Sequence, residues 1–239
     1  MDNWERDRIL NKFKVWFNES LIESHKRNTE KLKDINNFQI NPFLLYYLAN
    51  FLTGNSEPES LAKVLVYPRV LGTSITTSFG TLMQGRFITG VLDAYGSTTQ
   101  GIDIEFIDQK DGRKKYCQLK SGPNAINKDD VTTIINHFKQ VRNLAKTNSG
   151  DVRLGDMVFC LLYGEPEEKN AFIRDVEKEY TVYIGKEFWS RFTGDPNFYG
   201  HLIKAAGEVA NNVDMKAVVD SVIRELSDKV EVRFKGLSK

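Results

Sequence analysis

Cysteine and histidine are scarce in this chain of 239 residues, which has two cysteines and three histidines. Cys117 and Cys160 are far apart in the sequence, and the histidines are scattered, so no group shows the spacing of a zinc site. Both cysteines lie in apolar surroundings and no secretory signal precedes them, so we expect two buried thiols rather than a disulfide. The scarcity of these residues argues against a zinc or haem protein.

Long apolar runs and a strong net charge are also absent. No stretch reaches the roughly 18 continuous apolar residues that a membrane helix needs, and the first residues lack the basic start and apolar run of a signal peptide. We therefore expect a cytoplasmic protein without membrane association. The net charge of +1 neither favours nor excludes nucleic acid, because a local basic face binds phosphate.

The first third of the chain has the pattern of helices. Residues 4–34 carry apolar side chains mostly three and four positions apart. Asn41 is expected to cap a second helix that has Pro42 in its first position and ends at Gly54. A third helix is expected to end before Pro68.

The middle of the chain changes to the pattern of strands. Residues 102–106 alternate apolar and acidic side chains, and residues 115–120 follow after a turn-like segment, which predicts a β-hairpin. The apolar run 157–163 is typical of a buried strand. With helical patterns on both sides, the strands predict an α/β (α+β) fold in which helices flank a mixed central sheet.

Polar side chains on the two predicted hairpin strands point to a catalytic patch. Asp103 and Glu105 share one face of the first strand, and Gln118 and Lys120 share one face of the second, because side chains alternate. If these faces coincide, a carboxylate, an amide oxygen and an ammonium lie together, with the Leu119 carbonyl beside them. Mg²⁺ prefers such oxygen ligands, and a lysine can orient water and stabilise charge on a phosphate. The patch therefore predicts phosphodiester hydrolysis.

An ordinary explanation remains open for the same residues. Any half-exposed strand alternates polar and apolar side chains, so Asp103 and Glu105 can be an ordinary solvated face. Gln118 and Lys120 can likewise be plain surface residues. On the helix after the hairpin, Lys139, Arg142 and Lys146 form either a solvated face or a set of contacts to DNA phosphates. Four cations at the expected hairpin tip have the same two interpretations: Lys110, Arg113, Lys114 and Lys115.

The order of these motifs resembles the PD-(D/E)-x-K nuclease superfamily. Gly101-Ile102-Asp103 carries the first acid, and Gln118-Leu119-Lys120 stands where (D/E)-x-K is expected. More narrowly, the chain is similar to type II restriction endonucleases that cut interrupted GGNCC-type palindromes. The other blocks that carry this similarity are residues 40–43, 78–80 and 183–189.

This resemblance implies a Mg²⁺-dependent, site-specific deoxyribonuclease that leaves 5′-phosphate ends. Asp103, Gln118 and the Leu119 carbonyl would bind the metal, and Lys120 would activate the attacking water. It also implies a homodimer on double-stranded DNA in a prokaryotic cell, with a cognate DNA methyltransferase in the same system. We expect residues 1–72 to be a helical dimer contact or DNA clamp. Residues 73–239 would form the catalytic core with its C-terminal helices.

Two amides stand where the superfamily often has acids. Gln118 replaces the second acid, and Gln84 stands where an acid often precedes the first catalytic strand. A glutamine carbonyl ligates a metal without charge, so binding would be weaker or would depend on Glu105. Three other functions remain open: a structure-specific repair or junction nuclease, a DNA-binding module whose site has decayed, and a helical interaction protein without a DNA role.

Overall fold

The chain forms two compact units. Residues 1–15 and 80–207 form one, here called the α/β unit, and residues 16–79 and 208–239 form the other, the helical unit. Gln84 lies outside the described residues. In the described part of the chain, no helix is long and apolar enough to cross a membrane. The computed structural model describes residues 1–83, 87–91, 95–97, 99–147, 151–210 and 214–234.

A five-stranded mixed sheet forms the centre of the α/β unit. The strand order is β1-β2-β3-β4-β5, with β1, β2 and β3 antiparallel to one another in turn and β4 and β5 added in parallel. The β2–β3 pair is the predicted hairpin, and the prediction of a mixed central sheet is confirmed. The strands are β1 (Tyr95–Gly96), β2 (Ile104–Ile107), β3 (Lys114–Lys120), β4 (Met157–Leu161) and β5 (Thr181–Ile184).

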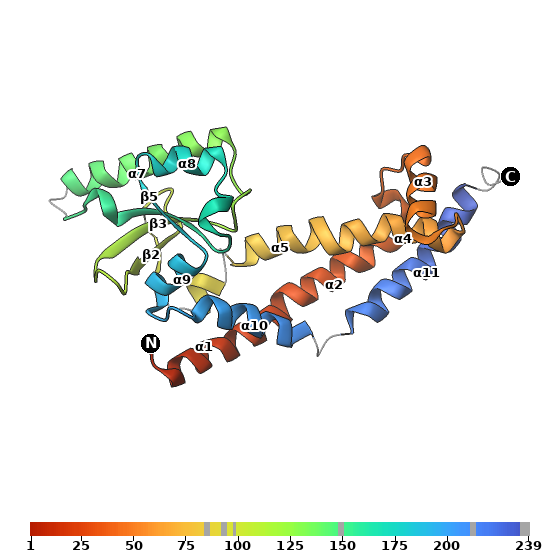
Figure 1. The fold of residues 1–239 in the computed structure, drawn as a ribbon, viewed down its shortest axis with the longest axis horizontal. Coiled ribbons are helices and arrows are strands. Elements are labelled where there is room, and N and C mark those ends of the chain that lie inside the picture. The colour runs from red at the N-terminus through yellow and green to blue at the C-terminus, as the bar shows by residue number, and fades with distance from the viewer. Residues whose placement is uncertain (84–86, 92–94, 98, 148–150, 211–213, 235–239) are drawn as a thin grey trace. The chain divides into compact units, whose positions relative to one another are not determined.

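Helices cover both faces of this sheet (Figure 1). On one face, Phe138 of α7 (Lys128–Thr147) joins a buried cluster with Phe159 of β4. On the other face, Phe106 of β2 contacts Phe188 of α9 (Lys186–Thr193). This unit also contains all or part of α1 (Asn3–Trp16), α6 (Ile88–Val91), α8 (Ala171–Glu177) and α10 (Phe198–Ala210).

The two cysteines lie inside the sheet of the α/β unit. Cys117 of β3 and Cys160 of β4 are both buried and free, so the expectation of two buried thiols is confirmed. Burial raises the pKa of the Cys117 thiol well above its usual value. Both side chains therefore act as small apolar residues that pack between the strands and the covering helices.

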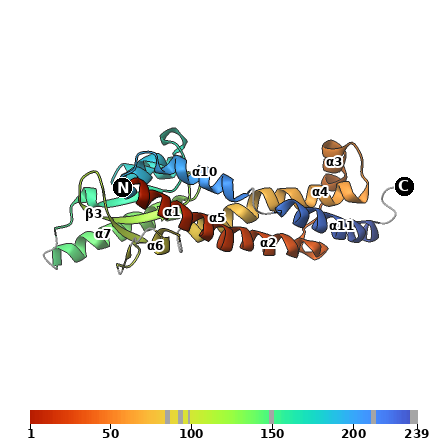
Figure 2. The ribbon, with the colours of Figure 1, turned by 90° about the horizontal axis from the view of Figure 1, so that it is seen from below.

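The helical unit has its own apolar core. Helix α4 (Pro58–Pro68) packs against α3 (Pro42–Thr53) and lies alongside α11 (Met215–Arg233) (Figure 2). Asn41 caps α3 by accepting hydrogen bonds from the backbone of its first turn, and Gly54 ends the helix with a φ of 78°. Both predicted ends of this helix are confirmed. The unit also contains α2 (Glu23–Glu30), η2 (Lys31–Lys33) and η3 (Ile35–Asn37).

The predicted helix end before Pro68 is wrong. The helix continues through Pro68 into a π-helical turn, η4 (Arg69–Ser74), and then into α5 (Ile75–Leu82). A proline removes one backbone hydrogen bond and crowds the preceding turn, and a wider turn accommodates that defect without ending the helix. The packing of α4 against α3 and α11 stabilises the helix on the N-terminal side of the proline. The helix predicted over residues 4–34 likewise contains a π-helical turn, η1 (Phe17–Ile22).

Candidate active site

The hairpin register brings the two predicted polar faces together. Ile104 pairs with Cys117 and Glu105 pairs with Tyr116, and the backbone N–H of Asp103 donates to the carbonyl of Cys117 at 3.0 Å. Residues opposite each other in a sheet direct their side chains to the same face. Asp103 therefore lies on the face that carries Gln118, at the end of β2.

The carboxylate of Asp103 is held against β3. The backbone N–H of Leu119 donates to its Oδ2 at 2.7 Å. Partial desolvation raises the pKa of Asp103, although the Leu119 hydrogen bond and the nearby Lys120 and His137 each lower it. The Asp103 carboxylate is partly desolvated but still exposed on one side, so a cation can bind to it from solvent.

The backbone of β3 adds a carbonyl oxygen at the same place. A strand residue directs its N–H and its C=O to the same edge of the strand. The carbonyl of Lys120 accepts from Leu162 at 3.0 Å and so faces β4. The backbone of Leu119 faces the opposite edge, where its N–H meets Asp103, so its carbonyl also faces the edge that carries this carboxylate.

The side chain of Lys120 is half-buried and has an acidic partner. Its Nζ lies 3.8 Å from Oδ1 of Asp130, in the first turn of α7. The other oxygen of Asp130 accepts from the backbone N–H of Asn127 at 2.8 Å, which fixes this carboxylate at the helix start. Asp130 therefore limits where the ammonium of Lys120 can reach while leaving it near Asp103.

The amide of Gln118 is buried in a contact that the sequence did not suggest. Its Nε2 donates to the carbonyl of Gly101 and, at 2.5 Å, to Nδ1 of His137 on α7. Gly101 has a φ of 80°, and a Cβ at this position would lie 2.2 Å from Cγ of His137. Only glycine fits there. Both contacts engage the amide nitrogen, which leaves Oε1 as the atom able to ligate a metal.

His137 is the site residue that sequence reasoning missed. It lies three residues after Ile134 and four before Val141, both of which are buried. A polar ring at helical spacing within an apolar face is the signal that could have drawn attention to it.

Glu105 has partners of its own. Ser97 donates to its Oε1 at 2.6 Å, and Lys114 forms an ion pair with its Oε2. These contacts engage both carboxylate oxygens away from Asp103. The three basic residues proposed for DNA contact are exposed along α7: Lys139, Arg142 and Lys146.

Two cations of the predicted hairpin tip are paired with the buried carboxylate of Asp156. Lys115 is 2% exposed, and its Nζ lies 2.6 Å from Asp111 and 3.4 Å from Asp156. Arg113 donates from Nε to Asp156 at 2.8 Å. The Arg113 guanidinium lowers the pKa of Asp156 to about 2. For Lys115, both sequence-based interpretations are therefore wrong, because its side chain turns inward to a buried carboxylate, whereas Arg113 pairs with the same carboxylate and stays partly exposed.

The oxygen atoms at the hairpin edge fit a hard cation. Among the residues that the structure describes, no group of three His, Cys, Asp or Glu side chains is placed to hold a metal. The edge offers one carboxylate, one amide and one backbone carbonyl, from Asp103, Gln118 and Leu119. Oxygen-only donors of this kind suit Mg²⁺, which keeps several waters, better than they suit zinc.

The sequence model of the family described as type II restriction endonuclease EcoO109I matches residues 12–214. The chain belongs to this family. It is a type II restriction endonuclease, that is, a site-specific deoxyribonuclease, and the enzyme class expected from the resemblance is confirmed. The match includes the whole hairpin and α7, which together carry the candidate site. A comparison with curated proteins gives no match.

Proposed function

We propose that this endonuclease hydrolyses double-stranded DNA with Mg²⁺ through Asp103, Gln118, Leu119 and Lys120, as in the PD-(D/E)-x-K pattern. The observation that carries the proposal is the hydrogen bond from Leu119 N–H to Asp103 across the hairpin. It joins a carboxylate, a backbone carbonyl and, one residue later, a lysine where β2 begins and β3 ends. From the resemblance we further propose cleavage at interrupted GGNCC-type palindromes that leaves 5′-phosphate ends.

Each residue has a distinct task in this proposal. Asp103 supplies the charged ligand, and Gln118 Oε1 and the Leu119 carbonyl supply neutral ones. A bound Mg²⁺ would polarise the scissile phosphate and lower the pKa of a water. Lys120 orients the attacking water and stabilises negative charge that develops on the phosphate. Asp130, 3.8 Å from the lysine, keeps the ammonium in position.

Digestion of unmethylated plasmid DNA in Mg²⁺ tests this function. We expect discrete bands whose ends are rejoined by ligase without prior phosphorylation. Lys120→Ala should lower the cleavage rate at least about 100-fold, the usual effect of losing one transition-state partner. Lys128→Ala, an exposed lysine at the start of α7, is the matched control and should cut normally.

The other outcomes discriminate between the alternatives. A preference for branched or damaged DNA over any sequence would indicate a structure-specific nuclease. Tight DNA binding without cleavage in Mg²⁺ or Mn²⁺ would indicate a decayed site. Normal cutting by Lys120→Ala would show that another residue activates the water. We also propose a cognate DNA methyltransferase, so plasmid from a host that contains it should resist digestion.

We propose that two copies of the chain associate through α3. This helix contains no charged residue, and its outer face carries Phe43, Tyr47 and Phe51 at 89%, 63% and 77% exposure. At about 200 Å² a side chain, these three offer about 450 Å², more than half of the roughly 800 Å² that each partner of a standard interface buries. An uncharged stripe meets its own copy across a two-fold axis without repulsion. Three leucines extend the stripe: Leu44, Leu48 and Leu52.

The molecular mass in solution tests the dimer. Wild type should sediment as a dimer at micromolar concentration, and Phe51→Glu should sediment as a monomer, because a carboxylate would be buried unpaired in the contact. Leu71→Glu is the control, since Leu71 is 75% exposed in the same unit but lies outside α3. A Phe51→Glu dimer as tight as wild type would place the contact elsewhere.

A further inference from the structure

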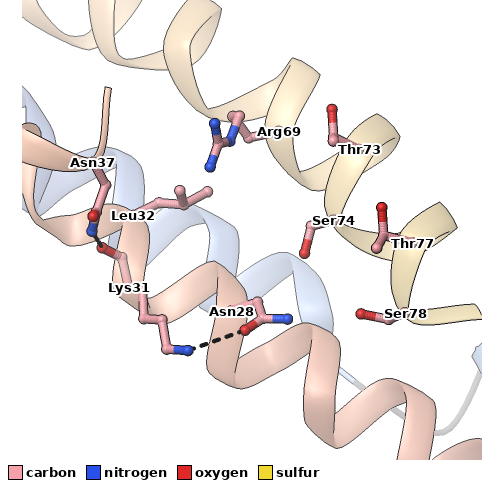
Figure 3. A pocket seen from close by; sticks show the side chains of 9 residues that line it. All are labelled: Asn28, Lys31, Leu32, Asn37, Arg69, Thr73, Ser74, Thr77 and Ser78. Atoms are coloured by element: carbon pink, nitrogen blue, oxygen red, sulfur yellow. Dashed lines mark hydrogen bonds between the residues drawn. The ribbon is translucent and has the colours of Figure 1, made fainter. Parts of the chain in front are cut away.

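An open cavity of about 370 Å³ lies within the helical unit, between α2 and the helix that includes η4 and α5 (Figure 3). Its volume is at the lower end of the roughly 300–1,000 Å³ of ligand pockets. Of the nine described residues that line it, Leu32 is the one apolar member.

The charges of the lining favour an anion. Lys31 and Arg69 line the cavity, and no carboxylate is among its described lining residues. Arg69 forms no hydrogen bond or ion pair with any residue that the structure describes, and Lys31 donates only to the amide oxygen of Asn28, at 3.3 Å. Other lysines of the same unit are neutralised: Lys33 pairs with Glu225 and Lys63 with Glu59, each at 2.6 Å. The cavity thus has two positive charges that pair with no carboxylate of the described residues.

Neutral donors complete the cavity. Ser74 of η4 and Ser78 of α5 turn their hydroxyls toward α2, where the amide of Asn28 lies, and the Arg69 guanidinium lies beside Leu32 (Figure 3). Hydroxyl, amide and guanidinium groups are the side chains that contact DNA phosphates, and the planar fork of arginine matches phosphate oxygens in particular. Arg69 and Ser74 are also the two ends of the π-helical turn η4, a rare geometry that often occurs at functional sites.

We infer that this cavity binds a phosphate group of the DNA backbone, as a contact outside the α/β unit. The inference rests on the proposed function for the source of the phosphate. The contact fixes the position of the duplex and reads no sequence, because a phosphodiester is the same at every base pair. Free inorganic phosphate has the same chemistry and is separated from DNA in the experiment.

Binding of a non-specific duplex without metal, measured over a series of salt concentrations, tests the inference. Arg69→Ala should weaken binding about tenfold, as expected for the loss of one charged hydrogen-bonding partner. The slope of the logarithm of the binding constant against the logarithm of the salt concentration should become shallower by about 0.9. Arg69→Lys should keep the salt dependence. Ser78→Asp, which adds a negative charge to the cavity, should weaken binding as well. Arg224→Ala removes an exposed arginine of the same unit outside the cavity and should bind like wild type.

Two results would overturn the inference. One is wild-type affinity and salt dependence in Arg69→Ala and Ser78→Asp. The other combines two observations: inorganic phosphate raises the Tm of wild type but not of Arg69→Ala, and Arg69→Ala binds duplex as wild type does. Together they would show that the cavity binds a free anion and not DNA. Failure of the wild-type protein to bind duplex would instead contradict the proposed function, and this inference with it. Because all substituted side chains lie at the surface or line the open cavity, unfolding curves should confirm that each variant is folded.

Discussion

Replacement of Gln118 by glutamate restores the acid that the superfamily pattern has at this position, and the structure predicts a cost. Gln118 is 7% exposed, and its amide nitrogen donates to the carbonyl of Gly101. Glutamate puts an accepting oxygen there and leaves the Gly101 carbonyl unsatisfied, which costs about 1–3 kcal/mol. The new charge also lies opposite Asp103 in the hairpin register, and repulsion between the two carboxylates raises their pKa values. We expect Gln118→Glu to lower the free energy of unfolding by about 2 kcal/mol in EDTA.

Mg²⁺ should reverse this loss if Gln118 is a ligand. A cation between two carboxylates binds more tightly than one between a carboxylate and an amide, so the variant should cut DNA and reach its half-maximal rate at a lower Mg²⁺ concentration. Mg²⁺ should also raise the stability of the variant more than that of wild type.

Urea unfolding with EDTA or Mg²⁺, together with a Mg²⁺ titration of cleavage, measures both effects. Gln118→Met is the matched control, because it removes the same donor without adding charge and should lose stability that Mg²⁺ does not restore. Wild-type stability of Gln118→Glu in EDTA would refute the role of the amide in holding Gly101. An unchanged Mg²⁺ dependence would refute Gln118 as a ligand.

Three further changes test the site and the fold around it. Asp103→Asn keeps an oxygen that can accept from Leu119 but removes the charge, so we expect DNA binding to persist and cleavage to fall at least about 100-fold; normal cleavage would assign the metal elsewhere. Gly101→Ala meets the His137 ring and adopts a positive φ, so the unfolding free energy should fall by about 2 kcal/mol or more, and a stable variant would contradict the contact. Asp156→Ala leaves buried Lys115 and partly exposed Arg113 with one acid fewer and should cost about 3 kcal/mol at pH 7. Because the pKa of Asp156 is lowered to about 2, its stabilising effect is complete above about pH 4 and is lost as the pH falls toward 2. The difference in urea unfolding between Asp156→Ala and wild type should shrink over that interval, and a constant difference would exclude this titration.

Features that depend on neighbouring residues were predicted from the sequence. The limits of α3 follow from Asn41 as cap and Gly54 as stop, and both signals act within one helical turn. The hairpin follows from strand alternation around a short turn, and its register then places Asp103 beside Leu119 without further information. For the candidate site, the residue types and their common face were therefore accessible from sequence.

Features that depend on distant partners were not predicted. The packing of α11 against α4 joins the C-terminal region to a helix about 150 residues earlier in the chain, and no local pattern specifies it. Lys115 is polar and adjacent to a turn, which predicts exposure, but Asp156 from another segment neutralises it inside the protein. His137 reaches Gln118 only because α7 crosses the sheet face at that position. In each case the deciding contact lies far along the sequence.

The amide at position 118 now has a physical explanation that the sequence pattern did not offer. A second carboxylate here would face the Gly101 carbonyl on one side and Asp103 on the other, and it would be charged in a position that is almost fully buried. The glutamine amide donates to the carbonyl through its nitrogen and still presents an oxygen. Desolvation already raises the pKa of Asp103, and a neutral amide adds no charge repulsion that would raise this pKa further. An amide at this position is therefore compatible with an intact site, in which the metal-free protein is stabilised and the metal is held by one charge instead of two. The bond from the amide nitrogen to Gly101 stabilises the protein whether or not the site cuts DNA, so the two explanations differ in cleavage and not in stability: an intact site cuts DNA in Mg²⁺, and a decayed site binds DNA without cutting it.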